Sequence, residues 1–293
     1  MLRDTRGSKA YWDKWVAFFE ETIAEDQDKS MRPTGNPGYM PQYIYDLAKR
    51  HLYLMLDRYS RGDPVNDLPQ HFDGLLDAWE ESERLGKGTW SKEEERLRRD
   101  WTINLHFYMD CFWLIGLALT LNIPDNQWLR LLALVDNEGR DALLDRVIAS
   151  RQPARKVGEV LCYPKAYRDL QRVIDAPADQ RPTLLKDYLG GWYASLENAG
   201  SSIAEPFLRT PYWYTSGDEN FEGGAYFGRW CVEAAAVAKA FGIDDSLCLG
   251  HPNYPGDLLR DGRSPRHADT ASAFHQVSRA RSARSWIGRL FRM

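Results

Sequence analysis

Apolar residues recur every three or four positions along most of this chain, which is the spacing of one face of an α-helix. Within residues 9–23 this stripe consists of Trp12, Trp15, Val16, Phe19 and Ile23. A second stripe occupies residues 40–59 and stops before Gly62 and Pro64, residues that commonly end a helix. A third contains Phe72, Leu75, Leu76 and Trp79. Each stripe predicts an amphipathic helix with one buried face.

The middle of the chain has a helix start signal followed by a strongly apolar run. Ser91 precedes Glu94 by three positions, a capping-box pattern. We expect the helix that begins there to reach about Leu121 through the run CFWLIGLALTL, residues 111–121. The run is shorter than the ~20 residues needed to span a membrane, so it predicts a buried helix. Further helices are expected at 129–135, 142–148, 183–196 and 224–241.

The remaining segments predict connections, and no segment shows the two-residue alternation of a β-strand. Residues 26–38 are rich in helix breakers and predict a loop, and residues 202–222 are irregular, aromatic and acidic. The predicted fold is therefore all-α, a compact, aromatic-rich multi-helix bundle. We divide it into an N-terminal helical region (8–122), a C-terminal helical region (123–260) and a flexible basic tail (261–293).

Two segments resemble each other. WLIGLALTLNIPD (113–125) and VEAAAVAKAFGIDD (232–245) both end a helix of small and apolar residues in an isoleucine followed by an acidic turn. Duplication of a helical unit and chance both remain open as explanations.

Composition places the chain among soluble globular proteins. It has 11 Trp, 15 Tyr and 11 Phe in 293 residues, which excludes a disordered chain. The four cysteines, at positions 111, 162, 231 and 248, have no C-x-x-C spacing and predict reduced, mostly buried thiols. The first residues lack the apolar segment of a secretory signal. We therefore expect a cytoplasmic protein.

The net charge of −4 conceals an asymmetry. Residues 262–293 hold seven arginines and one aspartate, a net charge of +6, so residues 1–261 carry −10. An acidic body repels nucleic acid and attracts basic partners. This balance disfavours a DNA-binding module and favours a protein that binds something basic.

A search for catalytic chemistry finds only weak candidates. His106 and Asp110 are four residues apart with Cys111 adjacent, which is compatible with a nucleophile and base but more typical of a polar group in a helix interface. No zinc-ligand spacing occurs, and Gly223, Gly224 and Gly228 lack the preceding strand of a phosphate-binding loop. We expect no cofactor and no metal.

Two further hypotheses stay open from the residues alone. Glu219, Glu222 and Glu233 can form an acid–base or metal set, although an ion pair between Glu233 and Arg229 is the simpler interpretation. A helical metal-dependent hydrolase is thus one alternative. The other is a nucleic-acid or membrane adaptor acting through residues 279–292, where arginines alternate with Trp286, Ile287 and Leu290.

Three stretches resemble the PoNe immunity family (PoNi). The most specific is residues 224–258, GAYFGRWCVEAAAVAKAFGIDDSLCLGHPNYPGDL. It is similar to the family's C-terminal pattern of an aromatic start, E-A-A-A-V, I-D-D-S and H-P-x-Y-P-x-D-L. LDRYSRGDPVNDLPQHFDGLLDAW (56–79) and LLKDYLGGWYASLENAG (184–200) resemble further parts of the family. The resemblance covers about residues 8–260 and leaves out the basic tail.

The resemblance implies an all-α, cytoplasmic immunity protein, and the lack of a catalytic set among the residues predicts that it is not an enzyme. Its expected partner is a cognate antibacterial DNase, commonly delivered by type VI secretion, whose active site or DNA approach it blocks. A DNase needs a basic surface for phosphates, which an acidic inhibitor can occupy. The patch we predict to bind the toxin consists of Tyr212, Trp213, Tyr214, Asp218, Glu219, Phe221 and Glu222. A cleft filled by these aromatics is the competing interpretation.

The family-signature residues are expected to build the scaffold instead. They are Tyr226, Trp230, Glu233, Asp244, Asp245, His251, Pro252, Tyr254, Pro255 and Asp257. We expect the last five to form a fixed turn that closes the fold, and Asp244 and Asp245 to cap a short helix.

Overall fold

The computed structural model of the protein describes residues 1–30, 36–201, 206–219 and 223–260. None of these residues forms a β-strand, which confirms the predicted all-α class. The basic tail, 261–293, lies outside the described residues.

The helices are α1 Lys9–Ser30, α2 Met40–Arg61, α3 His71–Gly86, α4 Lys92–Arg99, α5 Leu105–Thr120, α6 Asp125–Val135, α7 Leu144–Ala149, α8 Pro164–Asp175, α9 Arg181–Ser195, α10 Ser216–Glu219 and α11 Val232–Phe241. The 3-10 turns are η1 Val65–Gln70, η2 Pro206–Leu208, η4 Ser246–Cys248 and η5 Gly256–Leu259.

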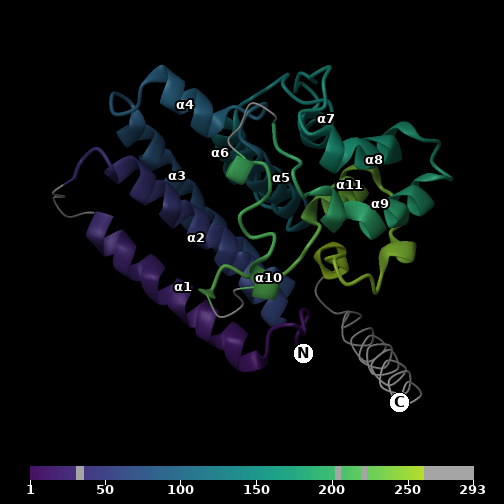
Figure 1. Ribbon diagram of the computed structural model, residues 1–293, viewed down its shortest axis with the longest axis horizontal. Coiled ribbons are helices and arrows are strands. Elements are labelled where there is room, and N and C mark those ends of the chain that lie inside the picture. Colours follow the sequence, from purple (N-terminus) through teal and green to yellow (C-terminus); the bar gives the residue numbers. More distant parts are fainter. Residues whose placement is uncertain (31–35, 202–205, 220–222, 261–293) are drawn as a thin grey trace, which may run out of the picture.

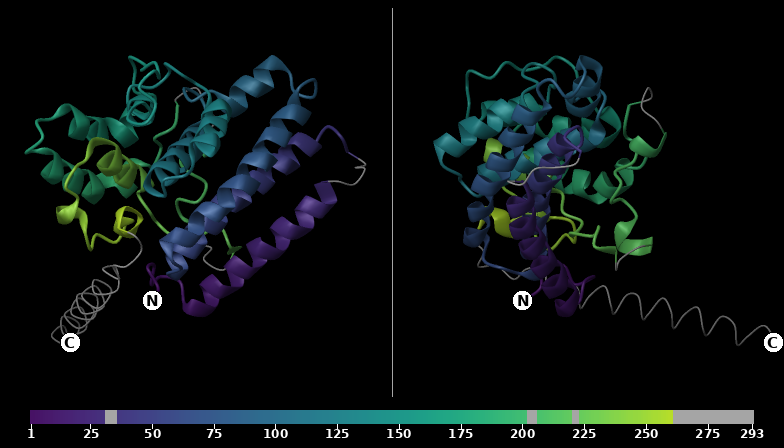
Figure 2. Two further views of the ribbon diagram at one scale, coloured as in Figure 1. Left: turned by 180° about the vertical axis from the view of Figure 1, so that it is seen from behind. Right: turned by 90° about the vertical axis from the view of Figure 1, so that its left-hand side faces the viewer.

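The long helices α1, α2 and α3 lie side by side, with α2 in contact with both neighbours (Figure 1). Helix α6 packs against α3 and α5, and α8 pairs with α9 on the opposite side of the molecule (Figures 1 and 2). Helix α5 runs through the centre, where every residue except His106 is buried. The apolar run therefore is the predicted buried helix. Among the described residues, no helix is long and apolar enough to cross a membrane.

Helices α5 and α11 cross at a glycine. A Cβ atom on Gly116 would lie 2.9 Å from Cγ1 of Val232 and 3.0 Å from Cβ of Ala236. The two helices also end alike, because Asn122 and Gly242 take positive φ angles and the next residue, Ile123 or Ile243, donates its N–H back into the helix. The two similar segments of the sequence are thus packed partners with matching ends.

The prediction of one helix from Ser91 to about Leu121 is wrong, because the structure has two helices there, α4 and α5. Ser91 and Glu94 do form the expected capping box of α4. That helix ends at Arg99, Trp101 turns into the core, and the side chain of Asn104 accepts a hydrogen bond from Phe107 N–H at 3.0 Å to start α5. The polar first half and the apolar second half of the pattern are two helices because a second cap lies between them.

The helix predicted for 224–241 begins later, at Val232, and the residues before it are non-helical. Gly228 has φ +100°, and a Cβ there would lie 2.5 Å from Oγ of Ser60. Two other differences are smaller: α1 continues through Ser30 into the predicted loop, and α8 was not predicted at all. Segment 202–222 contains only the single-turn helices η2 and α10 among its described residues.

A buried carboxyl lies at the α5–α11 contact. Glu233 has no exposed surface, and its Oε1 accepts a hydrogen bond from the Tyr167 hydroxyl at 3.0 Å. Burial raises the pKa of Glu233 to about 7. The proposed ion pair with Arg229 is wrong, because Arg229 lies before the helix and pairs with Asp218.

Glu233 therefore predicts a pH-dependent stability that a Glu233→Gln variant lacks. Between its ordinary value, 4.5, and about 7, the folded state keeps the proton and the unfolded state loses it, so wild-type stability falls as pH rises through this window. The variant is expected to gain up to about 3 kcal/mol relative to the wild type between pH 5 and pH 8. Urea unfolding at four pH values measures this. A difference that stays constant with pH contradicts it, and the exposed Glu159→Gln is the matched control.

Candidate functional site

The predicted toxin-binding patch lies on the segment that connects α9 to α11. This segment crosses the face of α2 and α5 that is turned to the viewer in Figure 1 and carries α10 towards α1. Its aromatic side chains alternate in direction: Tyr212 is 48% exposed, Trp213 is 6% exposed, and Tyr214 is half-buried. The Trp213 ring therefore packs into the core, while the rings of Tyr212 and Tyr214 lie at the surface.

Tyr212 is fixed by a polar cluster that we call the Tyr212 platform: Lys49 and Tyr53 of α2 and His106 and Asp110 of α5. The Tyr212 ring stacks on His106 with centroids 5.6 Å apart and planes at 9°, and its hydroxyl bonds to that of Tyr53. Nζ of Lys49 lies 5.4 Å from the Tyr212 ring centroid and 3.2 Å from Oδ2 of Asp110. Burial is the largest single influence and lowers the pKa of Lys49, but Asp110, Tyr212 and Tyr45 together outweigh it, so the pKa rises and the ammonium stays charged.

Trp213 is a core residue in the structure. Its ring lies 5.4 Å from that of Trp113 and 6.0 Å from that of Phe227, and it stacks on Trp192. A partner cannot reach this side chain without unpacking the core. Its role in the patch is to anchor the backbone between Tyr212 and Tyr214.

Tyr214 and Asp218 continue the surface beyond Trp213. The ring of Tyr214 stacks on that of Tyr193, with centroids 4.5 Å apart. The guanidinium of Arg229 lies over the Tyr193 ring, 4.2 Å from its centroid. Arg229 also forms an ion pair with Asp218, whose side chain is 61% exposed. The side chain of Glu219, and all of Phe221 and Glu222, lie outside the described residues.

Most of the signature residues are buried. Tyr226 donates to Asp4 at 2.5 Å, Trp230 donates to Ser60 at 2.8 Å, and Arg3 pairs with Asp257 at 2.7 Å. These contacts join residues more than 150 positions apart in the chain. They connect the N-terminal residues and α2 to the C-terminal end of the fold.

The signature turn has an internal network of its own. Asp244 accepts from Ser246 N–H at 3.0 Å, as expected of a capping residue. Asp245 does not cap η4: its carboxylate accepts from Tyr254 at 2.7 Å and pairs with Arg260. His251 accepts from Asn253 N–H at 3.2 Å, while Pro252 is exposed and Pro255 is buried.

The residues considered for catalysis are not arranged as a nucleophile and base. Asp110 pairs with Lys49, His106 lies under the Tyr212 ring, and burial raises the pKa of the Cys111 thiol well above its ordinary range. Burial also disfavours the charged form of His106 and so lowers the pKa of its imidazole. Across the described part of the chain, no group of three or more His, Cys, Asp or Glu side chains is placed to hold a metal ion.

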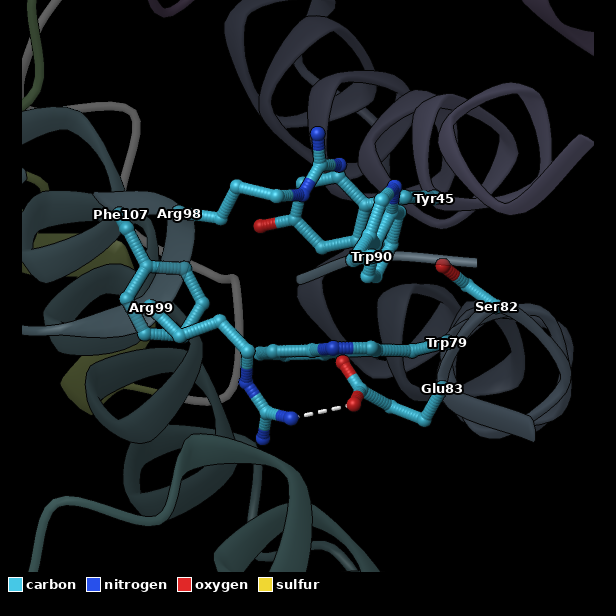
Figure 3. Close-up of a pocket in the computed structure, with 8 residues that line it drawn as sticks. All are labelled: Tyr45, Trp79, Ser82, Glu83, Trp90, Arg98, Arg99 and Phe107. Atoms are coloured by element: carbon cyan, nitrogen blue, oxygen red, sulfur yellow. Dashed lines mark hydrogen bonds and ion pairs between the residues drawn. The ribbon is translucent and has the colours of Figure 1, made fainter. Parts of the chain in front are cut away.

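One narrow pocket lies between α2, α3, α4 and α5 (Figure 3). The guanidinium of Arg98 lies 4.0 Å above the Trp90 ring, and Arg99 pairs with Glu83 at its mouth. The free space inside accommodates about one water molecule, which is far less than a small-molecule site needs.

Comparison with known proteins identifies the family. A family model for the N-terminal part of PoNe immunity proteins (PoNi) matches residues 3–133, and one for the C-terminal part matches residues 139–258. This chain belongs to the PoNe immunity protein family. A search of curated proteins gave no match.

The PoNe immunity fold also occurs in a solved structure. The crystal structure of protein PA2201 from Pseudomonas aeruginosa superposes with a TM-score of 0.62, covering 89% of this chain and 90% of that one at 18% identity. This likeness shows a shared fold. The family match implies an immunity protein that acts against a PoNe nuclease toxin.

Sequence reasoning missed the Tyr212 platform. Lys49 and Tyr53 are four residues apart on α2, a spacing that places them on one helix face, but the 40–59 stripe was considered only for its apolar members. His106 was weighed as a base, whereas in this PoNe immunity protein its ring supports Tyr212. Only the packing of the distant segment 206–219 gives these residues a common role.

Proposed function

We propose that this chain binds and neutralises a cognate antibacterial DNase toxin of the type VI secretion kind, in the cytoplasm and without catalysis. The family match over residues 3–258 carries the proposal. The −10 charge of residues 1–261 supports it physically, because a nuclease must present a basic surface to DNA phosphates. Carboxylates that occupy the places of phosphates compete with DNA and accelerate association.

The contact surface that we propose is the segment around Tyr212, Tyr214 and Asp218. Aromatic side chains with adjacent carboxylates are typical of the energetic centre of tight interfaces. Tyr212 and Tyr214 are each stacked on a ring of the scaffold, so little conformational entropy is lost when a partner covers them. Asp218 presents an exposed carboxylate at the edge, beside its ion-pair partner Arg229. Such a surface covers the active site or the DNA-binding face of the toxin.

A plasmid-cleavage titration tests this function. The nuclease domain encoded beside the gene of this chain is mixed with increasing amounts of the full chain, and plasmid degradation is followed. Cleavage is expected to stop at about one chain per nuclease, because a binding protein acts stoichiometrically. Undiminished cleavage at equimolar chain contradicts the function. Inactivation of many nucleases per chain contradicts the non-catalytic mode, and heat-denatured chain is the control.

A further inference from the structure

Helix α1 is the outermost of the three long helices (Figures 1 and 2). Its inner stripe, Trp12, Val16, Phe19 and Ile23, is buried. Phe18 lies outside this stripe and is 45% exposed. A single exposed apolar residue is ordinary, so Phe18 matters only through its surroundings.

The first of these surroundings is an aromatic support. Trp15 precedes Phe18 by three residues, and the two rings meet edge to face with centroids 5.3 Å apart. Trp15 is itself only partly exposed, because the backbone of Gly224 is pressed against it: a Cβ on Gly224 would lie 2.3 Å from the Trp15 ring. One side of the exposed Phe18 ring is therefore supported by Trp15.

The second is negative charge. Residues 9–30 contain six carboxylates and three lysines, a net charge of −3. Glu21 follows Phe18 by three residues, so it lies on the same helix face, and it is exposed. Lys14 precedes Phe18 by four residues, and its Nζ lies 4.7 Å from the centroid of the Trp15 ring. The outer face of α1 thus combines an aromatic ring with charges of both signs, on a helix whose net charge is negative.

The third is proximity to that segment. Tyr226 packs against Trp12 of α1 with centroids 5.9 Å apart, and a Cβ on Gly217 of α10 would lie 2.6 Å from the Tyr226 ring. Tyr226 is itself buried, and α1 and α10 both pack against it, so these two helices are neighbours in the fold.

The helix is also rigidly attached. Asp26 of α1 is buried, forms an ion pair with Arg50 of α2 and accepts a hydrogen bond from the Tyr43 hydroxyl at 2.5 Å. Tyr11, at the other end, donates to the carbonyl of Tyr226 at 2.7 Å. A surface fixed at both ends needs no ordering when it binds a partner.

We infer that the outer face of α1, centred on Phe18 and Glu21, is a second contact area for the basic DNA-binding face of the nuclease. This inference rests on the proposed function and extends it to α1, where Phe18 lies 194 positions before Tyr212 in the sequence. Phe18 supplies the apolar anchor, and Glu21 meets a cation that otherwise holds a DNA phosphate. A basic partner can cover both contact areas at once because α1 and α10 pack against the same residue, Tyr226, and residues 9–30 carry a net charge of −3.

The test compares two double variants that make the same change of charge, and each also removes one exposed apolar side chain. Phe18→Ala with Glu21→Lys alters α1, and Leu129→Ala with Glu159→Lys alters exposed residues of α6 and of the 150–163 loop. Affinity for the nuclease domain encoded beside this gene is measured by calorimetry at 150 mM salt. The α1 variant is expected to bind roughly 10- to 100-fold more weakly, and the control within about twofold of the wild type.

Hydroxyl-radical footprinting of the wild type provides a readout that needs no variant: oxidation of Phe18 is expected to fall in the complex. If the wild type binds but the α1 variant binds within about twofold of it, and Phe18 is oxidised equally in both states, the inference is overturned while the proposed function stands. If the wild type does not bind the nuclease domain, the proposed function fails and the inference fails with it.

Discussion

Replacing Tyr212 with alanine is expected to weaken binding of the cognate nuclease domain by roughly 30- to 100-fold. This result follows from the proposed contact surface, in which Tyr212 is the exposed ring that the scaffold positions most firmly. His106 supports one face of the ring, Lys49 lies 5.4 Å from its centroid, and its hydroxyl bonds to Tyr53. A partner that covers the exposed part of a fixed ring gains apolar contact with little loss of entropy.

Two companion variants separate contact from positioning. Tyr212→Phe keeps the ring and removes the hydroxyl, so its affinity is expected to stay within about fivefold of the wild type. Tyr39→Ala removes a tyrosine of similar exposure, 52%, from the start of α2 and is the matched control. Calorimetric titration measures all three affinities. A Tyr212→Ala variant that binds as tightly as Tyr39→Ala places the interface elsewhere.

The largest effect on stability is expected from Asp141→Ala. Asp141 is completely buried and accepts four hydrogen bonds, from the Tyr108 hydroxyl at 3.0 Å and from the N–H groups of Leu143, Leu144 and Cys162 at 2.9, 2.7 and 2.8 Å. Alanine leaves these buried donors without partners, which destabilises the fold by about 3–5 kcal/mol. The melting temperature should fall by roughly 10 °C.

The backbone around Asp141 is tightly packed, which disfavours a rearrangement that would replace those bonds. The N–H of Asp141 donates a hydrogen bond to Asp145 at 3.1 Å, and Gly158 approaches so closely that a Cβ there would lie 2.5 Å from the Asp141 nitrogen. Asp125→Ala is the control: its carboxylate is 88% exposed and pairs with Arg151 at 2.7 Å, so its loss is expected to matter by less than about 1 kcal/mol. Equal melting temperatures for the two variants contradict this account.

The helices that periodicity predicts best are those that bury one face or all faces. The stripes of α1, α2 and α3 and the apolar run of α5 appear in the structure close to their predicted places. Breaks within a pattern were harder to predict. Asp100 and Asn104 are polar residues that a helix tolerates, and only the burial of Trp101 shows that the chain leaves one helix there and starts another.

The sequence was an even poorer guide to the ion-pair and hydrogen-bond partners of buried charged residues. Arg229 and Glu233 are four residues apart, so an ion pair was the natural expectation, yet they face Asp218 and Tyr167 respectively. The i, i+4 rule applies only if both residues are helical, and Arg229 is not. Asp141 has no distinguishing sequence pattern, because a lone aspartate carries no sign that four donors converge on it.

By itself, the sequence determined the helical class, the buried central helix, the acidic body and the family, since periodicity, composition and ordered motifs are properties of the chain as written. Tertiary structure decided which aromatics are exposed. Tyr212 and Trp213 are neighbours with similar chemistry, but one lies on a platform built from α2 and α5 and the other fills the core. The reason is physical: exposure and ion pairing depend on which distant segments pack together, and neither is encoded in local spacing.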